Sequence, residues 1–152
     1  MTCVAWDGKT LAADKQASIG SIKFKVRKLD ETSDWLIGFA GDMNDCQKFL
    51  AWFKNNPKSK ANEFPFNNSG DDEDYSDFHI LMVHRRQKVI HYYNSATKSI
   101  PIVIDQPMFA IGNGAEFALG AMVAGKTSEE AVEIACQLCP DCGMGMDKLV
   151  LG

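Results

Sequence analysis

The stretch that decides the fold is Thr2-Cys3-Val4-Ala5-Trp6-Asp7-Gly8-Lys9-Thr10-Leu11-Ala12-Ala13-Asp14. Two short apolar segments flank Asp7-Gly8, which is a strong signal for a tight turn between antiparallel strands. A three-residue loop would pair Thr2 with Asp14, whereas a two-residue loop would pair Thr2 with Ala13. Either register predicts a carboxylate close to Thr2, and the three-residue loop would also put both side chains on one face.

Length and charge narrow the class of protein. The chain has 152 residues, which suits one domain spanning residues 1–152. Sixteen Lys and Arg against twenty Asp and Glu give a net charge of −4, which disfavours nonspecific nucleic-acid binding. No apolar run approaches the ~20 residues of a membrane helix, and the N-terminus does not resemble a secretory signal. We therefore expect a cytoplasmic protein whose five cysteines are reduced.

The remaining pattern alternates strands with helices in an order that predicts an α+β layered domain. Residues 22–29 alternate apolar and basic side chains, and residues 35–41 form an apolar strand that ends in glycine. A helix capped by Asp42 or Asn44 follows, and then a polar surface loop over residues 57–77. Further strands are expected at 79–84, 88–93, 100–104, 108–111 and 148–151, with helices at 115–124 and 127–138.

Thr2 is a candidate nucleophile. Methionine is removed most readily when a small residue follows it, so Thr2 can become the N-terminal residue. A free N-terminal threonine carries a hydroxyl nucleophile and an amine base in one residue. The α-amine has a reference pKa of about 7.7–8.0, so an appreciable fraction is neutral near pH 7.

An ordered set of motifs follows Thr2. These are residues 12–18 (AADKQAS), 25–29 (KVRKL), 37–42 (IGFAGD) and 110–115 (AIGNGA). In this order the set resembles the β-type proteasome subunits and HslV, of the N-terminal-nucleophile hydrolase superfamily. The resemblance implies a shortened four-layer αββα sandwich and a threonine-type endopeptidase that needs no cofactor or metal.

The resemblance also implies roles for individual residues. Thr2 matches the nucleophile, Asp14 its acidic partner, Lys25 the buried lysine and Gly38 the oxyanion-hole glycine, while Asn113 and Asp141 match positions near the nucleophile's amine. Lys25 is chosen over Lys28 by the Lys-Val-x-x-Leu pattern, and Lys23 and Arg27 are expected to be exposed. Ala17, Leu36 and Ala40 are expected to bind substrate.

Assembly is implied by the resemblance alone. A peptidase that cuts unfolded chains is expected to form a closed homo-oligomeric ring, and the family adds ring stacking and an ATP-dependent unfoldase. The helix pair that supports stacking is shortened in this sequence. The expected substrate is an unfolded polypeptide, with no membrane or nucleic-acid partner.

Two alternatives remain open. Asn113 stands where the family has a serine, and a second late serine is missing, which favours a non-catalytic ring subunit with the same fold. Separately, Cys136, Cys139 and Cys142 form a cluster that suggests a metal- or redox-binding module. A structural zinc site needs four ligands, however, and cysteines one turn apart on an apolar helix are more often core residues. The acidic run at 71–74 lacks the spacing of a calcium loop, and the glycine turn at 112–114 lacks a phosphate-binding lysine.

Overall fold

The computed structural model describes residues 2–55, 77–97 and 100–152. The strands are β1 (Val4–Trp6), β2 (Thr10–Asp14), β3 (Gln16–Ile19), β4 (Ile22–Lys25), β5 (Leu29–Glu31), β6 (Trp35–Gly41), β7 (Phe78–His84), β8 (Ile90–Asn94), β9 (Ile102–Ile104), β10 (Phe109–Ile111) and β11 (Met146–Val150). The helices are α1 (Met43–Asn55), α2 (Ala115–Val123) and α3 (Ser128–Leu138). None of the helices in these ranges is long and apolar enough to cross a membrane.

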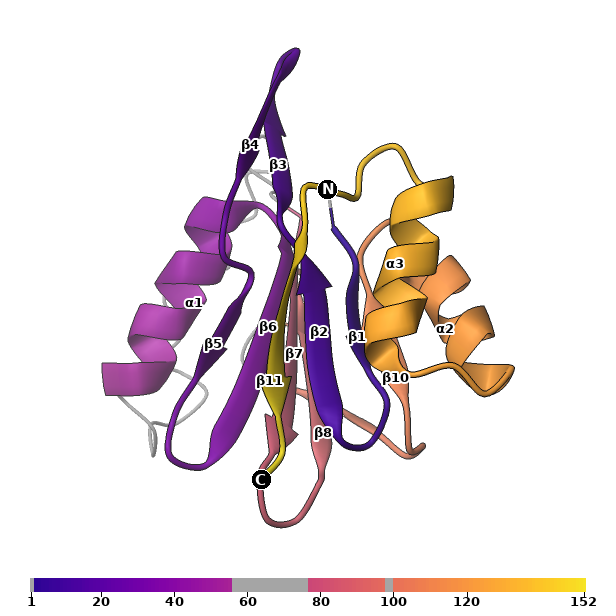
Figure 1. The fold of residues 1–152 in the computed structure, drawn as a ribbon. Helices are drawn as coiled ribbons and strands as arrows, with labels where there is room; N and C mark the ends of the chain where they lie inside the picture. Colours follow the sequence, from indigo (N-terminus) through magenta and orange to yellow (C-terminus); the bar gives the residue numbers. More distant parts are fainter. Residues whose placement is uncertain (1, 56–76, 98–99) are drawn as a thin grey trace.

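The elements stack in four layers (Figure 1). One antiparallel sheet has the order β10-β1-β2-β11, and the other has the order β5-β6-β7-β8-β9. Helix α1 covers the outer face of the five-stranded sheet, and α2 and α3 cover the outer face of the four-stranded sheet. The expected α+β fold, an αββα sandwich, is therefore confirmed.

Three apolar clusters hold the layers together, because each sheet face must bury its hydrophobic side chains against another layer. The cluster between the sheets includes Val4, Leu11, Leu36 and Leu81. The cluster under α1 contains its buried stripe Cys46, Phe49 and Leu50, and the third, under α2 and α3, is rich in alanine and cysteine. The small residues of the third cluster let two helices pack closely on a short sheet.

The helix boundaries follow their capping signals. Asp42 caps α1, since its Oδ1 accepts a hydrogen bond from the N–H of Asp45 at 3.0 Å. Thr127 and Glu130 form the reciprocal capping box of α3 that the sequence predicts. The acidic run at 71–74 and most of the expected 57–77 loop lie outside the described residues.

The expected strand over residues 22–29 is wrong as one element. It is divided into β4 and β5, and β4 pairs only with β3, a strand that the pattern did not predict. The β3–β4 ribbon projects from the end of the sandwich where the N-terminus lies (Figure 1). The alternation that predicted the strand therefore belongs to a projecting ribbon.

The first hairpin also adopts neither predicted register. Ala5 pairs with Ala12 and Trp6 with Leu11, so the turn is centred on Gly8 and Lys9. The Asp7 carboxylate accepts the N–H groups of Lys9 and Thr10, and Gly8 adopts a φ of +99° at the first turn position. Continued along the hairpin, this register places Asp14 opposite Cys3.

Candidate active site

The peptide bond between Thr2 and Cys3 is held at both of its polar groups. The carbonyl oxygen of Thr2 accepts a hydrogen bond from Gly114 N–H at 3.1 Å, and the next N–H, that of Cys3, donates to Asp14 Oδ1 at 3.0 Å. Thr2 is 3% exposed. Gly112 lies so close that a Cβ there would come within 2.1 Å of the Thr2 carbonyl oxygen, and its φ is +94°. The glycine turn at 112–114 is therefore needed for close backbone approach to Thr2.

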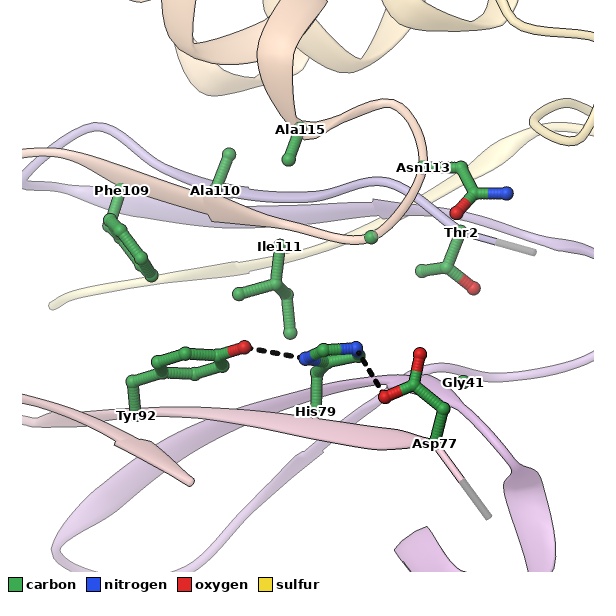
Figure 2. A pocket seen from close by; sticks show the side chains of 11 residues that line it. Thr2, Gly41, Asp77, His79, Tyr92, Phe109, Ala110, Ile111, Asn113 and Ala115 are labelled. Carbon is green, nitrogen blue, oxygen red and sulfur yellow. Dashed lines mark hydrogen bonds and ion pairs between the residues drawn. The ribbon is translucent and has the colours of Figure 1, made fainter. Parts of the chain in front are cut away.

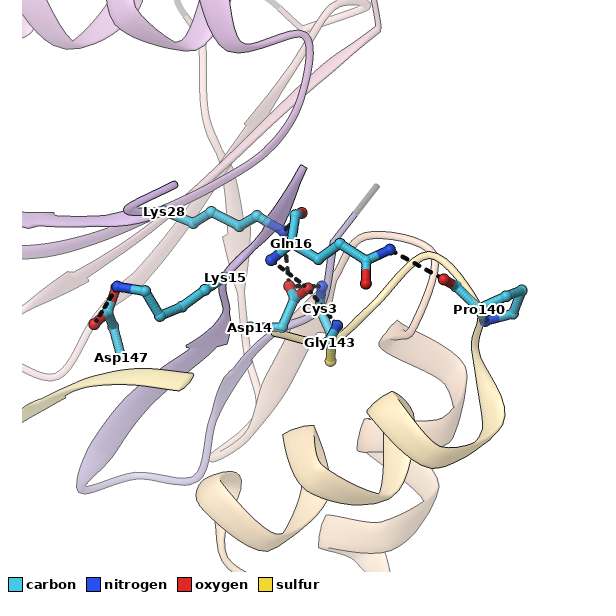
Figure 3. A network of polar contacts seen from close by, with 8 residues as sticks. All are labelled: Cys3, Asp14, Lys15, Gln16, Lys28, Pro140, Gly143 and Asp147. Carbon is cyan, nitrogen blue, oxygen red and sulfur yellow. Dashed lines mark hydrogen bonds and ion pairs between the residues drawn. The ribbon is translucent and has the colours of Figure 1, made fainter. Parts of the chain in front are cut away.

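Asp14 connects four segments of the chain (Figure 3). Its side chain is fully buried and accepts from Cys3 N–H and Lys28 Nζ on one oxygen, and from Gln16 N–H and Gly143 N–H on the other. A buried carboxylate needs such donors because burial without partners is costly. The interaction with the hairpin start was predicted, but it runs through the Cys3 N–H rather than through paired side chains.

The buried lysine is Lys28, and the choice of Lys25 was wrong. Lys28 is 1% exposed, and its Nζ lies 2.8 Å from Asp14 Oδ1 and 2.5 Å from the Gln16 carbonyl oxygen. Lys25 is exposed on β4, where its backbone pairs with that of Gln16. Exposure was expected for Lys23, whereas Lys25 was expected to be the buried lysine. Sequence reasoning missed Lys28 because the chain leaves the β3–β4 ribbon after Lys25 and enters the sandwich three residues later.

Two cavities meet at Thr2. The larger, about 450 Å³, is lined by Ala17, Phe24, Val26, Lys28 and Met43 among others. The smaller, about 260 Å³, opens between the two sheets and is lined by β10, the 112–113 turn, Asp77, His79 and Tyr92 (Figure 2). Thr2 and Gly41 line both. Ala17 lines the larger cavity, and its expected role in substrate binding stays a prediction.

Gly41, and not Gly38, presents its backbone to the cavities. Phe39 N–H donates to the Lys28 carbonyl oxygen at 3.0 Å, and N–H groups two residues apart on a strand point the same way. The Gly41 N–H thus points toward the Lys28 side, where the larger cavity lies. Gly41 has a φ of +89°, and a Cβ there would lie 2.1 Å from the Asp77 carbonyl oxygen.

Gly38, Leu36 and Ala40 lie in the interior instead. A Cβ on Gly38 would come within 2.5 Å of Val4 Cγ1, so this glycine permits close approach of the two sheets. Leu36 and Ala40 are buried in the same inter-sheet cluster and line neither cavity. The oxyanion role expected of Gly38 and the substrate contacts expected of Leu36 and Ala40 are therefore contradicted.

Asn113 and Asp141 come together although 28 residues separate them. The Asn113 side-chain amide donates to Asp141 Oδ2 at 2.9 Å, and Asn113 lines the smaller cavity beside Thr2. Asn113 thus lies beside Thr2 and Asp141 beside Asn113, and their expected roles at the nucleophile's amine stay predictions. Asn113 was expected to replace a serine, and its amide supplies a hydrogen-bond donor there but no hydroxyl.

The cysteine cluster belongs to the layer between the four-stranded sheet and its helices. Cys3, Cys139 and Cys142 are buried there, and a Cβ on Gly114 would lie 3.0 Å from Cys142 Sγ. Burial raises the pKa of the Cys3 thiol to about 12, with a further contribution from Asp14, and burial also raises the pKa of Cys142. Metal ligation needs thiolates, whereas these environments favour thiols. No group of three or more metal-ligating side chains is found in the described part of the chain.

Comparison with solved structures agrees with this architecture. HslV from Trypanosoma brucei matches with a TM-score of 0.70 and 20% identity over 98% of this chain and 97% of its own. BPH from Thiobacillus denitrificans, solved in complex with epoxomicin, matches with a TM-score of 0.63 and 17% identity over the whole of both chains. The Anbu complex from Pseudomonas aeruginosa, solved as a helical assembly, matches with a TM-score of 0.63 and 15% identity over 99% of this chain and 80% of its own.

The chain has the fold of HslV. Every one of these identities is low, so the likeness shows the shared fold alone and leaves the chemistry to the residues themselves. No family model and no curated protein matches the sequence. Lys28 and Gly41 are the two site residues that the sequence reasoning missed. Each had one usable signal: Lys28 precedes the apolar Leu29, and Gly41 ends an apolar strand directly before a helix cap.

Proposed function

We propose that this chain is a threonine-type endopeptidase that uses Thr2 as its nucleophile after removal of Met1. The observation that carries the proposal is the convergence of Thr2, Lys28 and Gly41 on one cavity, with the Lys28 ammonium paired to the buried Asp14. Nucleophile, fixed positive charge and backbone donor are the groups that acyl transfer requires.

The acylation step follows from these groups. The free α-amine of Thr2 accepts the hydroxyl proton, and Oγ attacks the carbonyl carbon of the scissile peptide bond. The Lys28 ammonium, held by Asp14 and the Gln16 carbonyl oxygen, favours both the neutral amine and the developing alkoxide. Gly41 N–H donates to the oxyanion, and loss of one such donor typically costs about 2.7–4 kcal/mol.

Two steps complete the reaction. The carbon–nitrogen bond of the tetrahedral intermediate breaks, and the leaving amine takes the proton that the Thr2 amine received. Water then attacks the ester carbonyl carbon, with the Thr2 amine accepting one proton, and the ester carbon–oxygen bond breaks as Oγ is protonated again. The net reaction is hydrolysis of one peptide bond.

The test is covalent labelling. Purified protein is incubated with a peptide epoxyketone or a peptide boronate, and intact mass followed by peptide mapping locates the adduct. We expect loss of Met1 and one adduct, on Thr2; Thr2→Ala should give none, and Thr10→Ala should label normally if it folds. Processed, assembled protein without an adduct on Thr2 contradicts the proposal.

A non-catalytic subunit with the same fold is the second candidate, and Asn113 favours it. The amide beside Thr2 is engaged with Asp141 and cannot relay a proton as a hydroxyl does. The two candidates separate cleanly, because a scaffold subunit assembles and leaves Thr2 unlabelled.

Assembly into a homo-oligomer belongs to the proposal. A similar protein, the Anbu complex, is solved as a helical assembly, and the proposed peptidase needs a compartment that keeps folded proteins from Thr2. We propose a closed ring, with ring stacking and an ATP-dependent unfoldase as further expectations. Sedimentation at micromolar concentration should give a species several times the 16.8 kDa chain mass; a monomer across that range contradicts the ring.

A further inference from the structure

A polar array faces Thr2 across the smaller cavity. Asp77 directly precedes β7, His79 is the second residue of β7, and Tyr92 lies on the neighbouring strand β8 (Figure 2). His79 Nδ1 lies 2.5 Å from the Tyr92 hydroxyl oxygen, and His79 Nε2 lies 3.1 Å from Asp77 Oδ1. We call these three residues the Asp77–His79–Tyr92 array. None of them has a part in the reaction proposed above.

The bonding pattern leaves one carboxylate oxygen directed to the cavity. The Asp77 carboxylate can only accept, so His79 Nε2 carries a hydrogen and donates to Asp77 Oδ1, while Nδ1 and the Tyr92 hydroxyl share the second hydrogen bond. Ser95 Oγ also donates to Asp77 Oδ1, at 3.4 Å. Among the described residues, Asp77 Oδ2 accepts no hydrogen bond, and the carboxylate faces Thr2 across the cavity (Figure 2).

The backbone of Asp77 is fixed directly at the reacting centre. Its carbonyl oxygen accepts the N–H of Asp42 at 2.8 Å and is the atom that a Cβ on Gly41 would meet at 2.1 Å. Tyr92 packs against Phe109 with ring centroids 5.6 Å apart, which holds the other end of the array. The carboxylate is thus positioned although its side chain is 62% exposed.

The two cavities give the array a place along a bound peptide. They share Thr2 and Gly41, so the attacked carbonyl lies where they meet and the substrate extends into both. The larger cavity borders the exposed ribbon strand β3 and has apolar walls. It therefore suits the part of the peptide that precedes the scissile bond and becomes the ester on Thr2. The smaller cavity then receives the residue that follows the scissile bond.

We propose that the Asp77–His79–Tyr92 array forms the leaving-group subsite of this peptidase and selects a lysine or arginine directly after the scissile bond. This inference rests on the proposed function. Among the described residues that line this cavity, Asp77 is the one that carries a carboxylate, and the walls at Phe109 and Ile111 suit an aliphatic stem. His79 is a positioning residue that orients the carboxylate.

The test is a set of peptides that differ only in the residue after the scissile bond. With lysine or arginine there, kcat/KM should exceed that of the leucine peptide by about fivefold, as for a partly exposed ion pair, and glutamate should be slower than leucine. The difference should lie mainly in KM. Asp77→Asn should reduce the lysine-to-glutamate ratio to near one.

The control is Asp34→Asn, which removes one carboxylate in the turn between β5 and β6, at the far end of the same sheet. This variant should keep the wild-type ratio of kcat/KM between the lysine and glutamate peptides. His79→Gln should lower the lysine preference without changing the charge of Asp77. If wild-type protein hydrolyses the lysine and glutamate peptides equally well, the subsite proposal is overturned while the peptidase proposal stands. If no peptide is cut and Thr2 forms no adduct, the peptidase proposal itself fails.

Discussion

Replacing Lys28 by methionine tests the centre of the site. The change keeps the aliphatic stem that packs beside Asp14 and removes the ammonium, which is bonded to Asp14 Oδ1 and the Gln16 carbonyl oxygen. Removing one partner of a buried ion pair typically costs about 3–5 kcal/mol, because the other charge is left buried. Asp14 keeps three backbone N–H donors, so we expect the lower end, a loss of about 3 kcal/mol in the free energy of unfolding.

For a chain of 152 residues this loss corresponds to a fall in Tm of about 6–12 °C, measured by calorimetry. Adduct formation at Thr2 should slow by about 10²-fold, measured by mass spectrometry at a temperature where the variant is folded. A double variant, Lys28→Met with Asp14→Asn, should lose less stability than the two single losses combined, since both changes act on one pair.

Lys25→Met is the matched control. Lys25 is an exposed lysine on the ribbon, so the same substitution should change the free energy of unfolding by less than about 0.5 kcal/mol and leave labelling at Thr2 near the wild-type rate. Equal losses of unfolding free energy and labelling rate in the two variants, or larger losses in Lys25→Met, would refute the assignment of Lys28 as the buried lysine.

Three further predictions concern backbone, thiols and helix caps. Gly41→Ala should slow labelling of Thr2 by about 10²-fold and lower Tm, because a side chain at φ +89° is strained and meets the Asp77 carbonyl oxygen. A labelling time course measures the first effect and a melting curve the second. The thiols of Cys3 and Cys46, whose pKa burial raises from 9.0 to about 12, should resist a thiol reagent near neutral pH until denaturant is added. Because the folded pKa is the higher one, the free energy of unfolding should fall as pH rises from 9.0 toward 12 in denaturant titrations. Thr127→Ala should lower the free energy of unfolding by about 1 kcal/mol, measured by denaturant titration, through loss of the α3 capping box; an unchanged midpoint would contradict that role.

The sequence predicted the layers better than the site. Apolar periodicity and capping residues located β6, α1, α2 and α3 closely, because those signals report burial on one face and unsatisfied backbone groups at helix ends. The same periodicity failed over 22–29, where the alternating side chains lie on a ribbon that projects from the sandwich.

Two glycines show why the site residues were harder to predict. Gly38 and Gly41 lie three apart on one strand, and composition cannot tell a glycine that lets two sheets approach from one that bends the chain beside a cavity. The distinction depends on Val4 and Asp77, which pack against the strand from distant parts of the sequence. Asp14 was found because a tight hairpin keeps the two ends of a short segment together.

The four donors on Asp14 tie the readiness of the nucleophile to protein synthesis. A ribosome makes Cys3, Asp14 and Lys28 long before Gly143, whose N–H is the last of the four donors to be added. A nascent chain therefore holds an unfinished network while it is still tethered, and its N-terminus lacks the support on which reactivity depends. Such late completion keeps the proposed peptidase latent among the unfolded chains around it until the segment that carries Gly143 has been made and has folded against Asp14.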